Sequence, residues 1–578
     1  MTPPDAIDCD VAVFGSGAAG MAAALTAACE GLSVALFDKA AALGGTTATS
    51  GGVAWIPGNS AAAAMGWTNR AEDLENARRL LRDQCGANWR PDLVEAYLRS
   101  GAEAIDYLAA HADLRFEPIP APDYVSSAPG AALKGRALSP LPFDGRLLGR
   151  HFNLVRAPRP AFMVLGGLMV GRKEIPQFLR PFSSWQAFSH VTRVVSRHAV
   201  DRVRFARGTR LLMGNALIGR AVQAALKRGV RIHTGAALTA LHREGGPAGG
   251  RVAGATVRMN GADVQVRASR AVVLATGGFA HSRRLRDAHA PAHPHSLSLA
   301  APENMGDAVE AALRVGASVD TRVESPGFWT PATRAVDGAG NETLYPYGHL
   351  DRGKPGAIIV DRTGRRFVNE ADSYHHVVLA MFQRHAHAPQ GAAFIVCDSD
   401  FLRQYGLGLA KPAPFPTGPL VRSGYLKRAD TLSGLASALG VNAAGLEAEV
   451  ARHNRFAATG RDEDFHKGES AFNRWNGDSR VQPNPCLAPL ARPPFYATEI
   501  FPCTIGMAAG LLTDEHARVL DATNTPIDGL YACGNDMASV TRGAYPGPGI
   551  TIGPGLVFGY RAMKHAASQS SPTPKELP

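Results

Sequence analysis

The feature that most constrains this chain is a glycine-rich turn that joins an apolar strand to a helix near its start. Residues 10–14 (DVAVF) form an apolar strand pattern, and Gly15-Ser16-Gly17-Ala18-Ala19-Gly20 follows directly. Residues 21–30 are rich in alanine, and a second apolar stretch over 33–37 ends at Asp38. Strand, turn, helix, strand and acid in this order predict a βαβ unit that binds a dinucleotide.

The residues of this turn have separate tasks in such a unit. Gly15 makes the tight turn, Gly17 lets the backbone approach a pyrophosphate, and Gly20 lets the helix pack on the sheet. The N-terminus of the helix faces the phosphates, and Asp38 accepts a hydrogen bond from a ribose hydroxyl. The alternative is a glycine-rich turn in an ordinary βαβ unit.

Glycine-rich segments far along the chain favour FAD over NAD as the dinucleotide. Residues 43–52 (LGGTTATSGG) follow Asp38 closely, whereas 272–278 (VVLATGG) and 529–536 (GLYACGND) lie far downstream. Three returns of this kind to one nucleotide domain suit a large cofactor that is threaded through it. A simple nicotinamide dehydrogenase does not need them.

Composition describes a globular chain with ample core. The 578 residues are 45% hydrophobic and 19% charged. The sequence contains no run of 18 apolar residues, so we expect no transmembrane helix. Residues 1–8 lack the pattern of a signal peptide, so we expect a cytoplasmic location. The seven cysteines form no CxxC pair and the 19 histidines no ligand pattern, so we expect reduced thiols and no metal site.

Positive charge is concentrated in one segment. Residues 171–210 hold nine Lys or Arg against Glu174 and Asp201, which accounts for seven of the eleven net positive charges. The apolar residues 161–170 lie directly before them. Together these neighbours predict that 161–210 contacts an anionic membrane surface, on its inner face. The alternative is a solvated pair of basic helices over a buried segment, and no motif predicts a nucleic-acid partner.

The order of these patterns predicts an α/β fold with a discontinuous, Rossmann-like FAD-binding domain. We expect its N-terminal part over 1–279, with a helix at 215–227, a strand at 230–233 and a hairpin over 251–266. An inserted α+β catalytic domain, with a helical tract at 435–456, covers 280–491 and caps the flavin. The FAD-binding domain resumes over 492–567, and a Ser/Pro/Lys-rich, disordered tail covers 568–578. The active site is expected between the two domains.

The stretch Tyr545-Pro-Gly-Pro-Gly549, followed by 550–555 (ITIGPG), connects these patterns to a known family. With the glycine-rich segments and 365–370 (RRFVNE), it resembles the flavoproteins that include soluble fumarate reductases and 3-ketosteroid dehydrogenases. The resemblance runs from Val11 to about His565 and is strongest to the 3-ketosteroid Δ1-dehydrogenases. It implies non-covalent FAD. We expect the FAD contacts to be Gly15, Ser16, Gly17, Ala18, Ala19, Gly20, Asp38, Lys39, Gly44, Gly45, Thr46, Thr47, Ser50, Gly51, Gly52, Thr276, Gly277, Gly278, Gly534, Asn535, Ile550 and Ile552.

The chemistry of a flavin dehydrogenase limits what such a site must contain. A hydride leaves a saturated carbon only if the neighbouring carbon loses a proton, and that proton is acidic enough only beside a carbonyl. The site then needs a base, an electrophile for the carbonyl oxygen and the flavin N5. Together with this chemistry, the resemblance to 3-ketosteroid Δ1-dehydrogenases implies 1,2-dehydrogenation of a 3-ketosteroid, in which a tyrosine takes the C2 proton and flavin N5 the C1 hydride. An external acceptor, a quinone or similar, then reoxidises the flavin.

The resemblance assigns these roles to particular residues. The hydroxyl of Tyr545 and the amide of Gly549 hold the C3 carbonyl. Tyr374, in a Glu-x-x-x-Tyr pattern, is the base, and Tyr124 donates a hydrogen bond to it. The family has a second aromatic residue where this chain has Val125, which weakens the match at Tyr124. A free phenol has a pKa of about 10, so Tyr124 and a cationic environment must stabilise the phenolate of Tyr374.

Several alternatives stay open on the sequence alone. A Δ4-(5α)-steroid dehydrogenase or a dehydrogenase of smaller cyclic ketones fits the same motifs, and Tyr345 and Tyr347 are rival bases. A fumarate reductase is disfavoured, because the family's Gly-Gly-x-His-Gly-x-Asn-Arg pattern is missing and 504–510 contain no histidine. A flavin-binding protein without catalysis is disfavoured by the three matched tyrosines.

Overall fold

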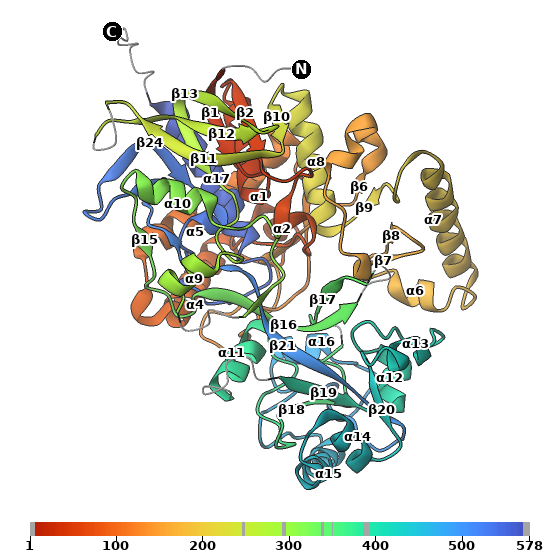
Figure 1. The fold of residues 1–578 in the computed structure, drawn as a ribbon. Helices are drawn as coiled ribbons and strands as arrows, with labels where there is room; N and C mark the ends of the chain where they lie inside the picture. Colours follow the sequence, from red (N-terminus) through yellow and green to blue (C-terminus); the bar gives the residue numbers. More distant parts are fainter. Residues whose placement is uncertain are drawn as a thin grey trace.

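The structure is a computed structural model of the chain, and two β-sheets organise it (Figure 1). It describes residues 6–245, 249–291, 296–336, 340–348, 351–384 and 392–569. Most of the predicted tail, from residue 570 onward, lies outside the described residues. The first sheet has eight strands and the second has seven. The first sheet has one large hydrophobic core, and the second has a separate core on each face.

The first sheet is the nucleotide-binding sheet that the sequence predicts. Its parallel strands are β10 (Arg231–Thr234), β2 (Val34–Asp38), β1 (Ala6–Phe14), β13 (Ala262–Leu274) and β24 (Pro526–Ala532), in this spatial order. The antiparallel strands β12 (Val252–Met259), β11 (Ala236–Arg243) and β23 (Arg518–Leu520) complete it. Residues 11–14 of β1 and 271–274 of β13 are at most 1% exposed, as expected for parallel strands that are covered on both faces.

Helices rich in small residues cover this sheet closely. Helix α1 (Ala18–Cys29) packs against α17 (Ile552–Ser568) and α8 (Met213–Lys227), and α17 packs in turn against α5 (Pro91–Ala112). A Cβ at Gly559 would lie 2.5 Å from the carbonyl oxygen of Ala19, so the two helix backbones nearly touch. This packing brings the N-terminus of α17 to the glycine-rich turn 15–20, the fingerprint turn, although the two are more than 500 residues apart in sequence.

The second sheet forms the inserted, capping part of the molecule. Its strands are β17 (Glu342–Pro346), β16 (Gly327–Val336), β21 (Phe495–Met507), β19 (Ala393–Cys397) and β18 (Ala357–Val360), with β14 (Leu297–Ser298) and β20 (Lys427–Ala429) on β21. Alternate residues of β18 and β19 face two different cores, following the period of two of a strand. One core is covered by α11 (Tyr374–Arg384) and α12 (Ser399–Tyr405), and the other by α14 (Leu432–Leu439) and α15 (Ala443–Thr459).

Two details of this sheet bear on the expectations from sequence. The predicted helical tract 435–456 is two helices, because Gly440 takes a left-handed conformation and ends α14. Strand β21 pairs with β16, β19 and β20, so Phe495–Met507 lies in the second sheet, within the predicted C-terminal part. The domain boundaries themselves stay a prediction.

A peripheral segment extends from the first sheet and carries α6 (Ile175–Leu179) and α7 (Trp185–Arg204) (Figure 1). No helix in the described part of the chain is long and apolar enough to cross a bilayer. The other described strands are β3 (Ala54–Trp55), β4 (Phe116–Pro118), β5 (Ala137–Pro140), β6 (Phe143–Asp144), β7 (Met163–Val164), β8 (Leu168–Met169), β9 (Arg210–Leu211), β15 (Val319–Asp320) and β22 (Gly510–Leu511). The other described helices are α2 (Gly45–Ala48), α3 (Ser60–Ala64), α4 (Arg70–Cys85), η1 (Gly86–Asn88), η2 (Gly145–Leu154), η3 (Pro160–Phe162), α9 (Arg283–His289), α10 (Asp307–Arg314), α13 (Gly418–Arg422), α16 (Ala471–Asn476) and η4 (Gly534–Asp536).

Candidate active site

The three fingerprint glycines have different reasons to be glycine. Gly15 has a φ of +101°, and a Cβ there would lie 2.1 Å from the carbonyl oxygen of Ala275. A Cβ at Gly20 would lie 1.9 Å from the carbonyl oxygen of Gly15. At Gly17 the nearest atom to a Cβ is Thr47 Oγ1 at 3.6 Å, which is an ordinary contact. The fold therefore requires Gly15 and Gly20, whereas Gly17 leaves room at the N-terminus of α1 that suits a pyrophosphate.

Asp38 lies at the end of β2, where its carboxylate fixes the fingerprint turn. It accepts hydrogen bonds from the backbone N–H of Ser16 at 3.0 Å, from the Ser16 hydroxyl and from the N–H of Ala40 at 2.8 Å. Burial raises the pKa of this carboxyl. The structure thus gives Asp38 a role inside the protein, and its contact with a ribose stays a prediction.

A buried carboxylate that sequence reasoning missed holds the glycine-rich segment 272–278. Asp536, in η4, accepts hydrogen bonds from the backbone N–H of Thr276, from its hydroxyl at 2.9 Å and from the N–H of Gly278 at 2.8 Å. Asp536 is fully buried, and burial raises its pKa to about 6. Its place directly after the predicted contacts Gly534 and Asn535 was the available signal. Asp536 therefore ties two predicted FAD segments together.

Asn304 is a second missed residue and joins two more of the predicted segments. Its amide Nδ2 donates to the carbonyl oxygen of Gly277 at 2.9 Å and to Thr46 Oγ1 at 3.4 Å. The neighbouring Thr47 accepts a hydrogen bond from the N–H of Ala18 at 3.1 Å. These bonds bring 46–47, 18 and 277 to one edge of the sheet, as the sequence predicts.

The other predicted cofactor residues surround this edge with varied partners. Lys39 forms an ion pair with Asp307 in α10. Ser50 donates to the carbonyl oxygen of Thr47 at 2.8 Å and accepts from the N–H of Gly52 at 3.1 Å. Gly44 and Gly45 have φ values of +108° and +46°, and Gly51 has no neighbour closer than 4.0 Å to a Cβ. Each of these FAD contacts stays a prediction.

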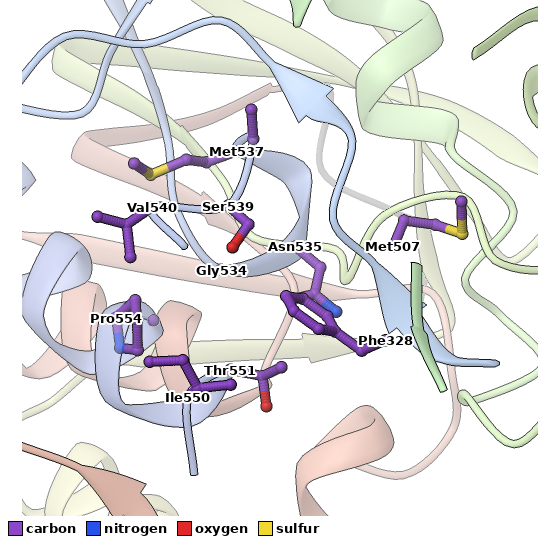
Figure 2. A pocket seen from close by; sticks show the side chains of 12 residues that line it. Phe328, Met507, Gly534, Asn535, Met537, Ser539, Val540, Ile550, Thr551 and Pro554 are labelled. Carbon is purple, nitrogen blue, oxygen red and sulfur yellow. The ribbon is translucent and has the colours of Figure 1, made fainter. Parts of the chain in front are cut away.

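A small hollow lies where η4, the start of α17 and the second sheet meet (Figure 2). The predicted residues Gly534, Asn535 and Ile550 line it, whereas Ile552 is not among its lining residues. Phe328 of β16 and Met507 of β21 contribute from the capping side. The complete lining is Phe328, Met507, Gly534, Asn535, Met537, Ala538, Ser539, Val540, Ile550, Thr551, Pro554 and Gly555.

The three tyrosines singled out in the sequence come together beside this hollow. The hydroxyl of Tyr124 donates to that of Tyr374 at 3.2 Å, and the Tyr374 hydroxyl donates to that of Tyr545 at 2.8 Å. The rings of Tyr124 and Tyr545 stack at 5.5 Å, and Tyr374 meets both edge-on. Phe328, which lines the hollow, packs edge-on against Tyr545 at 5.5 Å. Three segments that are 250 and 171 residues apart therefore share one hydrogen-bonded site.

The turn that carries Tyr545 is locked to the segment that carries Tyr124. The N–H of Tyr124 donates to the carbonyl oxygen of Pro546 at 2.7 Å. Asp123 accepts from the indole of Trp55 and from Arg136, each at 2.7 Å. Gly549 has a φ of +98°, and a Cβ there would lie 2.4 Å from the carbonyl oxygen of Val53. Glycine is therefore needed at 549 by the backbone itself.

Burial controls the protonation of the three phenols. It raises the pKa of Tyr374 and of Tyr545 well above the ordinary value, and it also raises the pKa of Tyr124. Arg352 opposes this shift at Tyr124 and Tyr374. The phenols are therefore neutral at neutral pH in the protein alone, and a base role for Tyr374 depends on groups that stabilise its anion.

Other candidates from the sequence lie apart from this trio. Tyr347 is fully buried in the core of the second sheet, where its hydroxyl bonds to Thr498 Oγ1 at 2.6 Å. Tyr345 packs its ring against those of Tyr347 and Phe162. All seven cysteines are free thiols. Among the described residues, no group of three or more His, Cys, Asp or Glu side chains could hold a metal ion.

Known proteins match this chain over nearly its whole length. A family model described as FAD binding domain matches residues 10–552. The 4-oxocyclohex-2-ene-1-carboxylate 5-dehydrogenase of Sinomonas cyclohexanicum is 38% identical, and the match covers 98% of this chain and 95% of that protein. The 3-oxosteroid 1-dehydrogenase of Mycobacterium tuberculosis is 35% identical, with 97% and 98% covered.

Solved structures agree with both the fold and the family. The crystal structure of 3-ketosteroid Δ1-dehydrogenase from Sterolibacterium denitrificans, in complex with 1,4-androstadiene-3,17-dione, is 35% identical with a TM-score of 0.87, and 97% of this chain and 99% of that chain are covered. A flavocytochrome c3 fumarate reductase is 21% identical with a TM-score of 0.62, with 97% and 78% covered, and shares the fold. The chain therefore belongs to the FAD-binding flavoprotein family that includes the 3-oxosteroid 1-dehydrogenases, and it is an FAD-dependent oxidoreductase that acts on CH–CH bonds.

Proposed function

We propose that this enzyme introduces the 1,2-double bond of a 3-ketosteroid. The observation that carries the proposal is the hydrogen-bonded chain of Tyr124, Tyr374 and Tyr545, with hydroxyl separations of 3.2 and 2.8 Å. These three tyrosines lie beside the hollow whose lining includes Gly534, Asn535 and Ile550, which are predicted to contact FAD. A base, an electrophile and a redox cofactor at one place are what removal of hydrogen beside a ketone requires.

The hydrogen-bonded contacts fit the proposed roles. The hydroxyl of Tyr374 lies 3.2 Å from that of Tyr124 and 2.8 Å from that of Tyr545, so a phenolate at Tyr374 would lie between two hydroxyl groups. Tyr545 and the amide of Gly549 hold the C3 carbonyl oxygen and stabilise the negative charge that develops on it. Tyr374, as the phenolate, takes the proton from C2, and Tyr124 donates a hydrogen bond to that phenolate. Bound FAD supplies the acceptor for the hydride that leaves C1, and an external acceptor such as a quinone reoxidises it.

Anaerobic reduction of the bound flavin tests this reaction. The purified holoenzyme is mixed without oxygen with a 3-keto-4-ene steroid, with a saturated 3-ketosteroid, with the 3-hydroxy analogue of the 4-ene and with succinate. Loss of flavin absorbance with the ketones alone, together with a 1-ene product, is the expected result. A new 4-ene in a saturated 3-ketosteroid would replace the proposal by a Δ4-(5α) reaction, and reduction by succinate alone would contradict it.

A smaller cyclic ketone is the second candidate substrate. The observation that favours it is the 38% identity to an enzyme named for 4-oxocyclohex-2-ene-1-carboxylate, against 35% to one named for 3-oxosteroids. Both substrates present a carbonyl beside a CH–CH bond, so the same three tyrosines serve both. The ratio of kcat/KM for 4-oxocyclohexanecarboxylate and for the steroid, measured side by side, decides between them.

We also propose that the peripheral segment 161–210 contacts an anionic membrane surface. Seven of the thirteen exposed large apolar residues in the described part of the chain lie in it, which marks this short segment as an interaction surface. They are Leu165, Ile175, Phe182, Trp185, Phe188, Val200 and Val203. Leu168 and Met169 are buried. The apolar contact is therefore made more by α7 and the residues 175–184 before it than by residues 161–170.

The outward side of α7 has the pattern of an interfacial helix. Trp185, Phe188 and Val203 are exposed along one side, whereas Val194 and His198 are buried on the opposite side, and Figure 1 shows α7 at the edge of the molecule. The two acids of the segment are paired within the protein, Glu174 with Arg210 and Asp201 with Arg146. Six exposed cations have no acidic partner among the described residues, and they complement anionic lipid headgroups. These cations are Arg172, Lys173, Arg180, Arg193, Arg202 and Arg204.

Flotation with liposomes tests the membrane proposal. Wild type is expected to float with anionic vesicles, less with neutral ones, and less at high salt because salt screens the charges. The double variant Trp185→Ser/Phe188→Ser should stay at the bottom, whereas Leu133→Ser, which changes an exposed apolar side chain outside the segment (62%), should float like wild type. Equal recovery with and without anionic lipid would contradict the membrane contact and support the alternative, a solvated basic face.

A further inference from the structure

A buried guanidinium lies behind the segment that carries Tyr374. Arg352 is 0% exposed. Its Nη1 donates to the backbone carbonyl oxygen of Glu370 and, at 2.6 Å, to that of Asp372. Tyr374, the first residue of α11, follows two residues later. The position of the phenol therefore depends on a turn whose carbonyl groups are held by Arg352.

The turn 370–372 is also held through its side chains, which restricts its movement. The carboxylate of Glu370 is fully buried and accepts from Arg366 at 2.8 and 2.9 Å, with Lys467 Nζ at 3.2 Å. The carboxylate of Asp372 accepts from Asn473 Nδ2 at 3.0 Å. Residues 370–372 thus have little freedom, and the geometry between Arg352 and the phenol is fixed.

Arg352 is the positive charge that acts on the phenols. It lowers the pKa of both Tyr124 and Tyr374, against the larger effect of burial. Two histidines follow Tyr374 on α11, but burial lowers the pKa of His375 well below its ordinary value and that of His376 to about 4. Both are therefore neutral at pH 7 and add no positive charge.

The neighbouring acids keep Arg352 charged in this buried place. Burial lowers the pKa of Arg352 to about 10, and the charges of Asp351 and Asp372 oppose that shift. The phenols of Tyr124 and Tyr545 also meet Tyr374. A cation that stays charged across the neutral range, with no other charged cation in the first turn of α11, is suited to stabilise a phenolate.

We propose that Arg352 is a positioning residue of the reaction, which holds the turn before Tyr374 and stabilises the phenolate of Tyr374 by its charge. The proposal rests on the proposed role of Tyr374 as base. It supplies the cationic surroundings that a tyrosine base requires, and it assigns them to one residue that lies outside the family motifs of this site. The proton balance is simple: the C2 proton passes to the phenolate oxygen, and Arg352 itself exchanges no proton.

The pH dependence of kcat/KM separates an electrostatic role from a purely structural one. Arg352→Met removes the charge, so the acid limb of the profile should move to higher pH by about one unit, the lower end of the effect of a nearby opposite charge. Arg352→Lys keeps the charge, so its acid limb should lie close to that of wild type, while its rate stays reduced. Arg366→Lys is the matched control, because it weakens the ion pair that another buried arginine makes with Glu370 of this turn. It should lower the melting temperature without moving the pH profile.

A second variant keeps the proposal testable if Arg352→Met does not fold. Asp372→Asn removes a negative charge next to Arg352 while its side-chain oxygen can still accept from Asn473, so the acid limb should move to lower pH. A profile unchanged in active Arg352→Met, or moved to higher pH in Asp372→Asn, overturns the role of Arg352. Failure of wild type to reduce its flavin with any ketone instead overturns the proposed function, so the two failures are distinguishable.

Discussion

The structure separates two fingerprint glycines that look alike in the sequence, and this gives a sharp prediction. At Gly15, a Cβ would lie 2.1 Å from a backbone oxygen, and φ is +101°. At Gly17, φ is −66° and a Cβ meets only Thr47 Oγ1 at 3.6 Å. Gly15→Ala should therefore destabilise the protein itself, whereas Gly17→Val should leave the fold intact and block the pyrophosphate.

The expected magnitudes follow from these contacts. At Gly15, a strained backbone costs about 1–3 kcal/mol, and the forced shift of the backbone at Ala275 adds about 1–3 kcal/mol of overpacking. At Gly17, the loss is that of the ligand: a free FAD concentration a thousandfold above Kd stabilises a protein by about 4 kcal/mol. Gly17→Val should lose that gain and little else.

Thermal unfolding with and without added FAD measures both effects. Gly15→Ala should melt below wild type in both conditions, and Gly17→Val should match the FAD-free wild type in both. Absorbance of the flavin band after gel filtration gives the bound fraction independently. Retention of FAD by Gly17→Val, or a melting temperature of FAD-free Gly15→Ala equal to that of wild type, would refute the reasoning.

Three further predictions concern the site. Tyr545→Phe removes the hydroxyl proposed to hold the carbonyl oxygen, and turnover should fall by roughly 10²–10³, as for other donors to a developing oxyanion; a smaller fall measured by steady-state kinetics would move that role elsewhere. Tyr124→Phe should cost less in rate and should shift the acid limb of kcat/KM to higher pH, because the hydrogen bond to the phenolate of Tyr374 is lost; an unmoved limb would contradict this. Asp536→Ala leaves the buried N–H groups of Thr276 and Gly278 without their acceptor, at about 1–3 kcal/mol each, so equilibrium dialysis should show weaker FAD binding, and unchanged affinity would deny Asp536 its supporting role.

The parts of the fold that sequence predicts well are those with a strong local signal. The strand at 10–14, the turn at 15–20 and the helix after it follow from apolar runs and glycine spacing, and the structure has them as β1 and α1. The helix expected at 215–227 and the strand at 230–233 appear as α8 and β10. The helical tract expected at 435–456 appears as α14 and α15, with a break at the left-handed Gly440 that the prediction did not specify.

The parts that sequence could not supply are the contacts between distant segments. The three tyrosines came from family motifs, but no pattern in the chain says that their hydroxyls are within 3.2 and 2.8 Å. Asp536, Asn304 and Arg352 were missed because each acts through backbone groups of another segment. A single buried carboxylate, amide or guanidinium carries no periodicity, so its role becomes visible only in three dimensions.

The central claim is that Tyr374 removes a proton beside the ketone while the flavin is reduced. The most direct test is the single-turnover rate of anaerobic flavin reduction by the preferred ketone, in wild type and in Tyr374→Phe, with the FAD content checked by absorbance. We predict that the variant binds FAD normally and that its flavin is reduced slower by orders of magnitude. A reduction rate near that of wild type would contradict the account, and Tyr345 and Tyr347 would then be the next bases to test.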